Sequence, residues 1–229
     1  MTRRDGQAML VSAMLRIIAG EYQSRRLLSP PDEAVSRPYP ERIKEAVFNM
    51  LREWFDEGGS VLDLFAGVGS MGLEAVSRGA ERVVLVEQSR SIFRLLEQNI
   101  DALGCADRAT AIRGEALSET LLLRAPKPVD VVFIDPPYAM MLEESARRRV
   151  LGQISRLRRL MAKPGLLFLR SPRGPDDLNL TVDGFVGPEV RRYARDMWVL
   201  VYEPELPPPA GRAGEAEEAG PHASPHAEA

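Results

Sequence analysis

VLDLFAGVGSMGLEAVSRGA, residues 61–80, decides the fold class of this 229-residue chain. Its first five residues, VLDLF, form a short apolar run that is typical of a strand buried on both faces of a sheet. Gly67, Gly69 and Gly72 follow with the G-x-G-x-x-G spacing, and a helical pattern covers residues 70–78. A strand, a glycine loop and a helix in this order predict a nucleotide-like ligand at the carboxyl edge of a parallel sheet.

Apolar runs alternate with helical patterns along most of the remaining chain. The further predicted strands are 82–87 (RVVLVE), 109–113 (ATAIR), 129–134 (VDVVFI), 165–170 (GLLFLR) and 197–203 (MWVLVYE). The predicted helices are 37–55, which begins near Pro40, then 70–78, 91–103 and a basic helix before residue 165. Strands separated by helices predict an α/β fold, with a mostly parallel, Rossmann-like sheet and helices on both faces.

Four segments are predicted along the chain. Residues 1–13 and 205–229 are expected to be disordered. The tail is rich in Pro, Gly, Ala and Glu and cannot bury enough apolar surface to offset its ordering entropy. Residues 14–36 contain LRIIAGEYQSRRLLSP, which predicts a hairpin of two short strands around Gly20. Residues 37–204 are then long enough to form one domain with its own core.

Histidine and cysteine are scarce, and this narrows the possible chemistry. The two histidines, His222 and His226, lie in the predicted disordered tail, and Cys105 is the one cysteine. Ser-His-Asp and Cys-His catalysis, a bound metal and a disulfide scaffold are therefore not expected. No stretch approaches the roughly 20 apolar residues of a membrane span, and MTRRDGQAMLV at the start has no apolar signal core. We expect a monomeric protein in the cytoplasm.

The formal net charge of −3 is unevenly distributed along the chain. Acidic residues outnumber the single base, Arg212, within residues 205–229, whereas residues 146–173 hold many Arg and Lys residues and no acid. Such a basic block can bind a polyanion. It can equally be the solvated face of a helix in an arginine-rich protein, which is the interpretation that charge alone favours.

Two acidic residues accompany the glycine loop. Glu87 ends the next strand about 20 residues after the loop, where a carboxylate can accept hydrogen bonds from both hydroxyls of a ribose. Asp63 lies inside the first strand, near the mouth of the loop. A carboxylate there would repel a pyrophosphate but suits the cationic amine and sulfonium of S-adenosylmethionine. Alternatively, Asp63 only accepts hydrogen bonds from backbone amides of the loop.

The tetrapeptide Asp135-Pro136-Pro137-Tyr138 follows the predicted strand 129–134, at the edge where open α/β sheets bind ligands. Its prolines stiffen the backbone and have no N–H groups. The acceptors at this edge are therefore carbonyl groups and the Asp135 carboxylate, and Tyr138 offers a platform for a flat ring. Such acceptors suit the hydrogens of an exocyclic amino group that attacks a methyl group. Taken alone, the tetrapeptide is also compatible with an ordinary turn.

The sequence resembles the RsmD-type methyltransferases, which methylate the N2 amino group of a guanine in small-subunit (16S) ribosomal RNA. The resemblance rests on VLDLFAGVGSMGLEAVSRGA, VEQ, FIDPPY and the leading RPYPERIKEAVFN, and it spans residues 15–203. It implies the class I methyltransferase fold with a seven-stranded sheet and S-adenosylmethionine as the cofactor. It also implies that the partner is ribosomal RNA or a small-subunit assembly particle.

The resemblance further implies roles for individual residues. The cofactor-binding residues would be Arg37, Asp63, Phe65, Gly67, Gly69, Glu87, Gln88, Glu115 and Ala116. The catalytic residues that receive the guanine would be Asp135, Pro136 and Tyr138, and RNA would be contacted by Arg16, Arg25, Arg26 and Arg42. The chain departs from the family pattern at Tyr39, where Thr is usual, and at Lys44, where Arg is usual.

Other functions remain open on the sequence alone. The same strand-end motif serves methyltransferases of adenine N6 in DNA or RNA and of glutamine in proteins. The glycine loop also fits an NAD-linked enzyme. A third alternative is a non-catalytic RNA-binding module or assembly factor.

Overall fold

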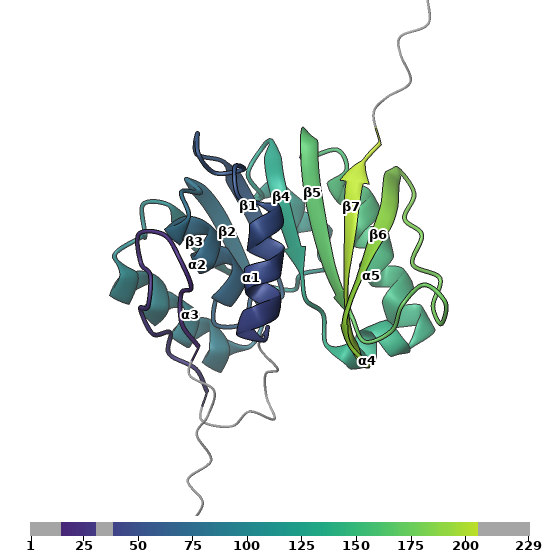
Figure 1. Ribbon diagram of the computed structural model, residues 1–229, viewed down its shortest axis with the longest axis horizontal. Coiled ribbons are helices and arrows are strands. Elements are labelled where there is room, and N and C mark those ends of the chain that lie inside the picture. The colour runs from purple at the N-terminus through teal and green to yellow at the C-terminus, as the bar shows by residue number, and fades with distance from the viewer. Residues whose placement is uncertain (1–14, 31–38, 206–229) are drawn as a thin grey trace, which may run out of the picture.

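The computed structural model describes residues 15–30 and 39–205, and a seven-stranded sheet with helices on both faces forms its centre (Figure 1). Arg37 and the predicted disordered termini, Glu205 excepted, lie outside the described residues. The strands are β1 (Ser60–Leu64), β2 (Arg82–Glu87), β3 (Ala109–Arg113), β4 (Val129–Ile134), β5 (Met161–Ser171), β6 (Phe185–Ala194) and β7 (Met197–Pro204). The helices are α1 (Glu41–Met50), α2 (Ser70–Ser77), α3 (Arg90–Leu103), the 3-10 helix η2 (Glu119–Leu123), α4 (Tyr138–Leu142) and α5 (Glu144–Leu157).

The strand order explains why a ligand site forms beside β1. The sheet has the order β3-β2-β1-β4-β5-β7-β6. Neighbouring strands from β3 to β5 are parallel, and β7 is antiparallel to both β5 and β6. The chain therefore builds outward from β1 in one direction and from β4 in the other, and ligands bind at such a switch point in open α/β sheets. The predicted Rossmann-like fold is confirmed.

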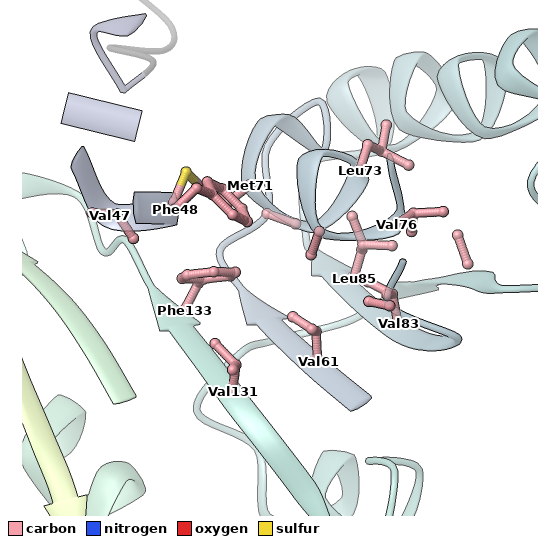
Figure 2. Packing of buried hydrophobic residues seen from close by; sticks show 14 of the residues in the cluster. Val47, Phe48, Val61, Met71, Leu73, Val76, Val83, Leu85, Val131 and Phe133 are labelled. Atoms are coloured by element: carbon pink, nitrogen blue, oxygen red, sulfur yellow. The ribbon is translucent and has the colours of Figure 1, made fainter. Parts of the chain in front are cut away.

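Each face of the sheet has its own apolar layer. Helices α1, α2 and α3 cover one face, where Phe48 of α1 packs on Phe133 of β4 with ring centroids 5.6 Å apart (Figure 2). On the other face, Val150, Ile154 and Leu157 of α5 are fully buried. Strand β1 is buried along its whole length because its alternate side chains enter both layers. This double burial explains the continuous apolar run in its sequence.

The helix predicted over residues 37–55 is shorter in the structure. Helix α1 follows Pro40, as expected, but it ends at Met50. The N–H groups of Leu51, Trp54 and Gly58 each bond to the carbonyl three residues earlier, so residues 51–57 form successive turns instead of a helix. Amphipathic spacing alone did not distinguish these turns from a continuing helix.

No strand was predicted at β6, and the predicted start of β5, residue 165, lies four residues after its observed start at Met161. Strand β6 lies at the edge of the sheet, and most of its side chains are exposed or half-buried. An edge strand has one strand neighbour and needs no continuous apolar run, so it gave little signal in the sequence.

The predicted hairpin of two strands in residues 14–36 is wrong. The described part of this segment, residues 15–30, contains one antiparallel bridge, between Arg16 and Arg26, and no strand. The N–H groups of Ile18 and Ala19 bond to the Glu74 carboxylate of α2 instead of pairing across a hairpin. The two arms still pair with each other, since the N–H groups of Ile17, Ser24 and Leu27 donate to the carbonyls of Arg25, Ile17 and Leu15. The segment is therefore a turn without regular strands, held by these hydrogen bonds and by α2.

Candidate active site

A cavity of about 520 Å³ lies at the carboxyl edge of the sheet, within the range of roughly 300–1,000 Å³ that is usual for small-molecule sites. Strands β1 to β4 all end here, and Arg170 near the end of β5 completes the wall. The cavity is lined by Phe65, Gly67, Val86, Glu87, Gln88, Ser89, Ile92, Gly114, Ala116, Asp135, Pro136, Pro137, Tyr138 and Arg170. The two motifs singled out in the sequence therefore face one space.

The three glycines of the loop serve different purposes. Gly67 has φ +58°, and a Cβ added there would meet nothing within 4 Å, so its backbone borders open space in the cavity. Gly69 has φ +91°, and its Cβ would lie 2.7 Å from Leu96 of α3. A Cβ on Gly72 would lie 2.6 Å from Leu85 of β2. Gly69 and Gly72 thus allow α2 to pack closely on its neighbours, whereas Gly67 leaves room for a ligand.

Glu87 is held in a fixed orientation at the cavity wall. Its Oε2 accepts a hydrogen bond of 3.1 Å from the Gly67 N–H, and its Oε1 accepts one of 2.6 Å from the Ser89 N–H. Each carboxylate oxygen keeps lone-pair capacity for another donor. Glu87 can therefore accept further hydrogen bonds from donors in the cavity, and its predicted contact with a ribose remains a prediction.

Asp63 makes the contact that the alternative interpretation of its role predicted. Its side chain is buried, and its Oδ2 accepts a hydrogen bond of 2.9 Å from the N–H of Gly72 in α2. Burial raises the pKa of Asp63 to about 8, the Gly72 hydrogen bond opposes this rise, and the charges of Asp135 and Glu87 add to it. Asp63 does not line the cavity, so its influence on a cofactor remains a prediction.

These contacts bear on the class of nucleotide that the loop can accept. In dinucleotide-binding folds the pyrophosphate sits at the start of the helix and receives backbone N–H groups. Here the N–H groups of Gly67 and Gly72 already donate to the carboxylates of Glu87 and Asp63. These N–H groups are therefore already engaged and are not available to a pyrophosphate, whereas a nearby cation favours the ionised form of a carboxylate such as Asp63.

Asp135 forms a buried ion pair that its sequence context did not indicate. The Nε of Arg170, whose side chain is 6% exposed, lies 2.6 Å from the Asp135 Oδ1. Burial raises the pKa of Asp135 to about 6, and Arg170 opposes this shift. Arg170 ends the apolar run GLLFLR in β5, and Asp135 follows the neighbouring strand β4. The contact depends on the pairing of these two strands, which the local sequence does not indicate.

The Arg170 guanidinium contacts the rings of two tyrosines. Its Cζ lies 4.7 Å from the ring centroid of Tyr39 and 5.4 Å from that of Tyr138, distances typical of cation–π contacts. Burial raises the pKa of Tyr39 well above its usual range, so the phenol is neutral. The departure from the family pattern at Tyr39 thus supplies an aromatic surface for Arg170.

The structure separates the predicted cofactor residues into two groups. Phe65, Gly67, Glu87, Gln88 and Ala116 line the cavity. Of the predicted cofactor residues that the structure describes, which exclude Arg37, the three that do not line it are Asp63, Gly69 and Glu115.

Glu115 faces away from the cavity, although the next residue, Ala116, lines the cavity wall. Its half-exposed carboxylate lies 2.7 Å from Arg149 of α5. The buried Gln153 of α5 donates to the carbonyl of Ala116 at 3.1 Å and so fixes this part of the wall. A cofactor contact from the Glu115 side chain remains a prediction.

None of the four predicted RNA-binding arginines lines the cavity. Arg16 pairs with Glu41 of α1 at 2.7 Å, and Arg25 donates to the carbonyl of Ala102 at 2.8 Å. Arg26 and Arg42 are exposed. RNA contact by these four residues stays a prediction.

Several positive charges of the basic block 146–173 are paired with acidic side chains from outside the block. Arg148, Arg149 and Arg156 pair with acids that precede the block, namely Glu144, Glu115 and Glu119. These arginines are exposed on α5. They fit the solvated helix face that charge patterning favoured.

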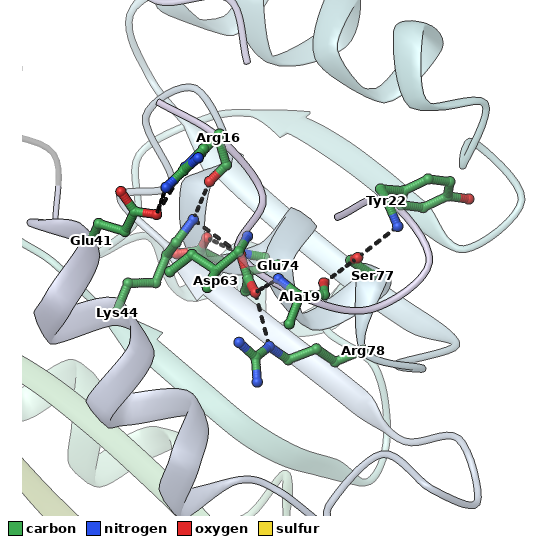
Figure 3. A network of polar contacts seen from close by, with 11 residues as sticks. Arg16, Ala19, Tyr22, Glu41, Lys44, Asp63, Glu74, Ser77 and Arg78 are labelled. Carbon is green, nitrogen blue, oxygen red and sulfur yellow. Dashed lines mark hydrogen bonds and ion pairs between the residues drawn. The ribbon is translucent and has the colours of Figure 1, made fainter. Parts of the chain in front are cut away.

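A buried carboxylate anchors the N-terminal segment to the domain (Figure 3). Glu74 of α2 is fully buried and receives the N–H groups of Ile18 at 2.8 Å and Ala19 at 3.1 Å. Its oxygens also lie 3.1 Å from the Nζ of Lys44 and 2.9 Å from the Nε of Arg78. Lys44, the second departure from the family pattern, thus joins α1 to α2.

Within residues 15–30 and 39–205, no group of three or more His, Cys, Asp or Glu side chains could hold a metal ion. No helix in the same described residues is long and apolar enough to cross a membrane.

Comparisons with known proteins agree with this arrangement. Residues 15–173 match the family described as conserved hypothetical protein 95. The chain is 35% identical over 133 residues to ribosomal RNA small subunit methyltransferase D of Haemophilus influenzae, covering 58% of this chain and 68% of that protein. It is 36% identical over 135 residues to the protein of the same name in Escherichia coli K12, covering 58% of this chain and 66% of that protein.

Solved structures resemble the chain over a larger share of its length. The Escherichia coli protein yhhF superposes with a TM-score of 0.69 at 27% identity, covering 84% of this chain and 98% of that one. A hypothetical protein of Thermus thermophilus superposes with a TM-score of 0.66 at 30% identity, covering 83% of this chain and 99% of that one.

Proposed function

Since the chain belongs to the family described as conserved hypothetical protein 95, the RsmD-type methyltransferases, we propose that it methylates the exocyclic N2 of a guanine in 16S ribosomal RNA. The methyl donor would be S-adenosylmethionine, and the substrate would be ribosomal RNA or a small-subunit assembly particle. The observation that carries this proposal is the Asp135 carboxylate, which lies in the same cavity as Gly67 and Glu87. One wall of the cavity suits a nucleoside, and the other presents acceptors for an amino group.

The residues of the cavity fit S-adenosylmethionine by charge and by shape. Glu87 would accept hydrogen bonds from the ribose hydroxyls, and Gly67 provides open space beside the ligand. The apolar side chains of Ile92 and Ala116 suit the adenine ring. When bound, this cofactor supplies a methyl group already activated by a sulfonium, so the protein need not provide a strong base.

The protein's own contribution would be to position and desolvate the guanine. The base would leave its RNA stack and lie against the ring of Tyr138. Because Arg170 already lies over that ring, the base would use the opposite face. Asp135 and the Pro136 carbonyl would accept the N2 hydrogens and direct the nitrogen lone pair toward the methyl group. Asp135 can then take up the proton that the amine loses.

Deleting the gene should abolish one N2-methylguanosine of 16S ribosomal RNA. Mass spectrometry of nucleosides from purified 16S RNA measures this loss directly. Complementation with the wild-type gene should restore the modification, and complementation with the Asp135→Asn gene should not. A nucleoside profile unchanged by the deletion refutes the proposed substrate.

Cofactor affinity should increase with pH up to about 8. Asp63, whose pKa is raised to about 8, is mostly protonated below that pH, and a nearby cation favours its ionised form. Binding should therefore release a proton, and affinity should fall by up to about tenfold for each pH unit below 8. Isothermal titration in buffers of different ionisation enthalpy measures both effects.

Two controls accompany this titration. Asp63→Asn should flatten the pH dependence, whereas Glu97→Gln, a change at an exposed position of α3, should leave it unaltered. NAD, added as a competitor and titrated alone, should not bind. Binding of NAD without binding of S-adenosylmethionine contradicts the proposed function.

A further inference from the structure

The Asp135–Arg170 pair brings together two neighbouring strands at the cavity. Asp135 follows β4 and Arg170 lies in the parallel strand β5. The guanidinium of Arg170 is held by the Asp135 carboxylate at 2.6 Å and lies over the rings of Tyr39 and Tyr138. A buried cation held on several sides has little freedom to move, so it also fixes the carboxylate oxygen that it contacts.

We propose that Arg170 is a positioning residue that keeps Asp135 an oriented anionic acceptor, and that this pair thereby selects guanine over adenine. The inference rests on the proposed function and adds the basis of its base specificity. It assigns a role to Arg170, which belongs neither to the glycine loop after β1 nor to the Asp135–Tyr138 motif after β4.

The selection follows from the hydrogen-bonding edges of the two bases. Guanine presents N1–H and N2–H as adjacent donors, and an ionised carboxylate is acceptor-only with two oxygens. Adenine presents an N6–H donor beside the N1 acceptor, whose lone pair would face the anion. A protonated Asp135 could donate to adenine N1 and accept from N6. The charge on Asp135 therefore decides which base fits.

The other groups near Asp135 do not supply that charge control. They are Asp63 on β1, Tyr138 at the start of α4 and Tyr39 before α1. Burial raises the pKa values of Asp63 and Tyr39, which leaves both mostly neutral at pH 7. In this set of described residues, Arg170 is the cation that lowers the pKa of Asp135, which burial still holds at about 6. Without Arg170 the carboxyl group would be largely protonated near neutral pH.

Arg170→Met and Arg170→Lys test this role. The first measurement is the pH titration of the Asp135 side-chain carbon by NMR in the cofactor-free protein, assigned with Asp135→Asn. The second is the pH profile of methyl transfer to 16S RNA from the deletion strain. Arg170→Met should move the carboxyl midpoint and the acid limb of the profile upward by about 1–3 pH units. Arg170→Lys, which keeps the charge, should restore most of both.

Arg82→Met is the matched control. Arg82 is exposed at the start of β2, at the end of the strands opposite the cavity. Its loss should change neither the titration midpoint of Asp135 nor the acid limb of the pH profile. A 16S RNA transcript with adenosine at the target position is the specificity probe. The measured quantity is the rate of methylation of the adenosine transcript divided by that of the guanosine transcript. This ratio should be at least tenfold higher for Arg170→Met than for the wild-type protein.

Several outcomes would overturn the inference. One is a lower rate for Arg170→Met at every pH with an unmoved carboxyl midpoint, which is the pattern of a merely structural residue. Another is an unchanged ratio of adenosine to guanosine methylation. If Arg170→Met does not fold, Arg170→Gln removes the charge but keeps hydrogen-bond donors, and the same measurements apply. If wild-type protein methylates no guanine in 16S RNA, the proposed function fails, and the NMR titration still decides whether Arg170 controls Asp135.

Discussion

Asp135→Asn is expected to lower the rate of methyl transfer by about 10²–10⁴-fold while cofactor binding persists. The substitution keeps the size of the side chain and one oxygen that can accept from Arg170, whose Nε lies 2.6 Å from the carboxylate. It replaces the other acceptor with an N–H₂ group that would face the amino group of the guanine. The loss should therefore appear in the chemical step.

Single-turnover transfer of a labelled methyl group to 16S RNA measures this loss. Isothermal titration with S-adenosylmethionine and thermal unfolding show whether the site and the fold are intact. Asp176→Asn, a change at an exposed turn position after β5, is the control and should behave as wild type. Transfer by Asp135→Asn within a few-fold of wild type would contradict the acceptor role of Asp135.

This variant also separates an enzyme from an assembly factor. A non-catalytic RNA-binding module should retain its effect on ribosome assembly when Asp135 is altered. Deleting residues 15–30 is a poor test of RNA binding, because the deletion removes the two backbone N–H groups that Glu74 accepts. Point substitutions of exposed arginines are cleaner.

Glu74→Ala is expected to destabilise the protein by about 3–5 kcal/mol, the cost typical of breaking one side of a buried ion pair. Glu74 is fully buried, and its removal leaves the buried Lys44 without its carboxylate partner. It also leaves the N–H groups of Ile18 and Ala19 without their acceptor. Burial already lowers the pKa of Lys44, and the loss of Glu74 would lower it further.

Urea unfolding followed by circular dichroism measures this effect. Glu144→Ala is the matched control, since the Glu144–Arg148 pair is an exposed helical pair and should contribute little. The double variant Glu74→Leu with Lys44→Met should recover part of the loss, because it removes both buried charges and keeps side-chain volume. A cost for Glu74→Ala as small as that for Glu144→Ala would show that the cluster does not anchor the segment.

Local patterns in the sequence were sufficient for the central part of the fold. The apolar runs at 82–87, 109–113 and 129–134 coincide with β2, β3 and β4. The glycine spacing placed the start of α2 correctly, and Asp135 to Tyr138 lie at the cavity as expected. These features are local, because a strand buried on both faces and a tight glycine turn each need particular residues in a row.

Features that depend on distant neighbours were not predictable in this way. Strand β6 has mostly exposed side chains, and two N–H groups of the N-terminal segment bond to Glu74, which lies far along the chain. Glu115 lies beside the cavity wall in sequence, but its side chain pairs with Arg149 outside. Each outcome depends on which element packs nearby.

The sequence by itself determined a sheet with a glycine loop, and an acceptor motif at the carboxyl edge of that sheet. Only the tertiary structure decided that Arg170 meets Asp135 and the rings of Tyr39 and Tyr138, and that Lys44 and Glu74 form a buried pair. The reason is physical. A strand or turn is specified by the preferences of consecutive residues, whereas a buried charge needs a partner that only the folding of remote segments can supply.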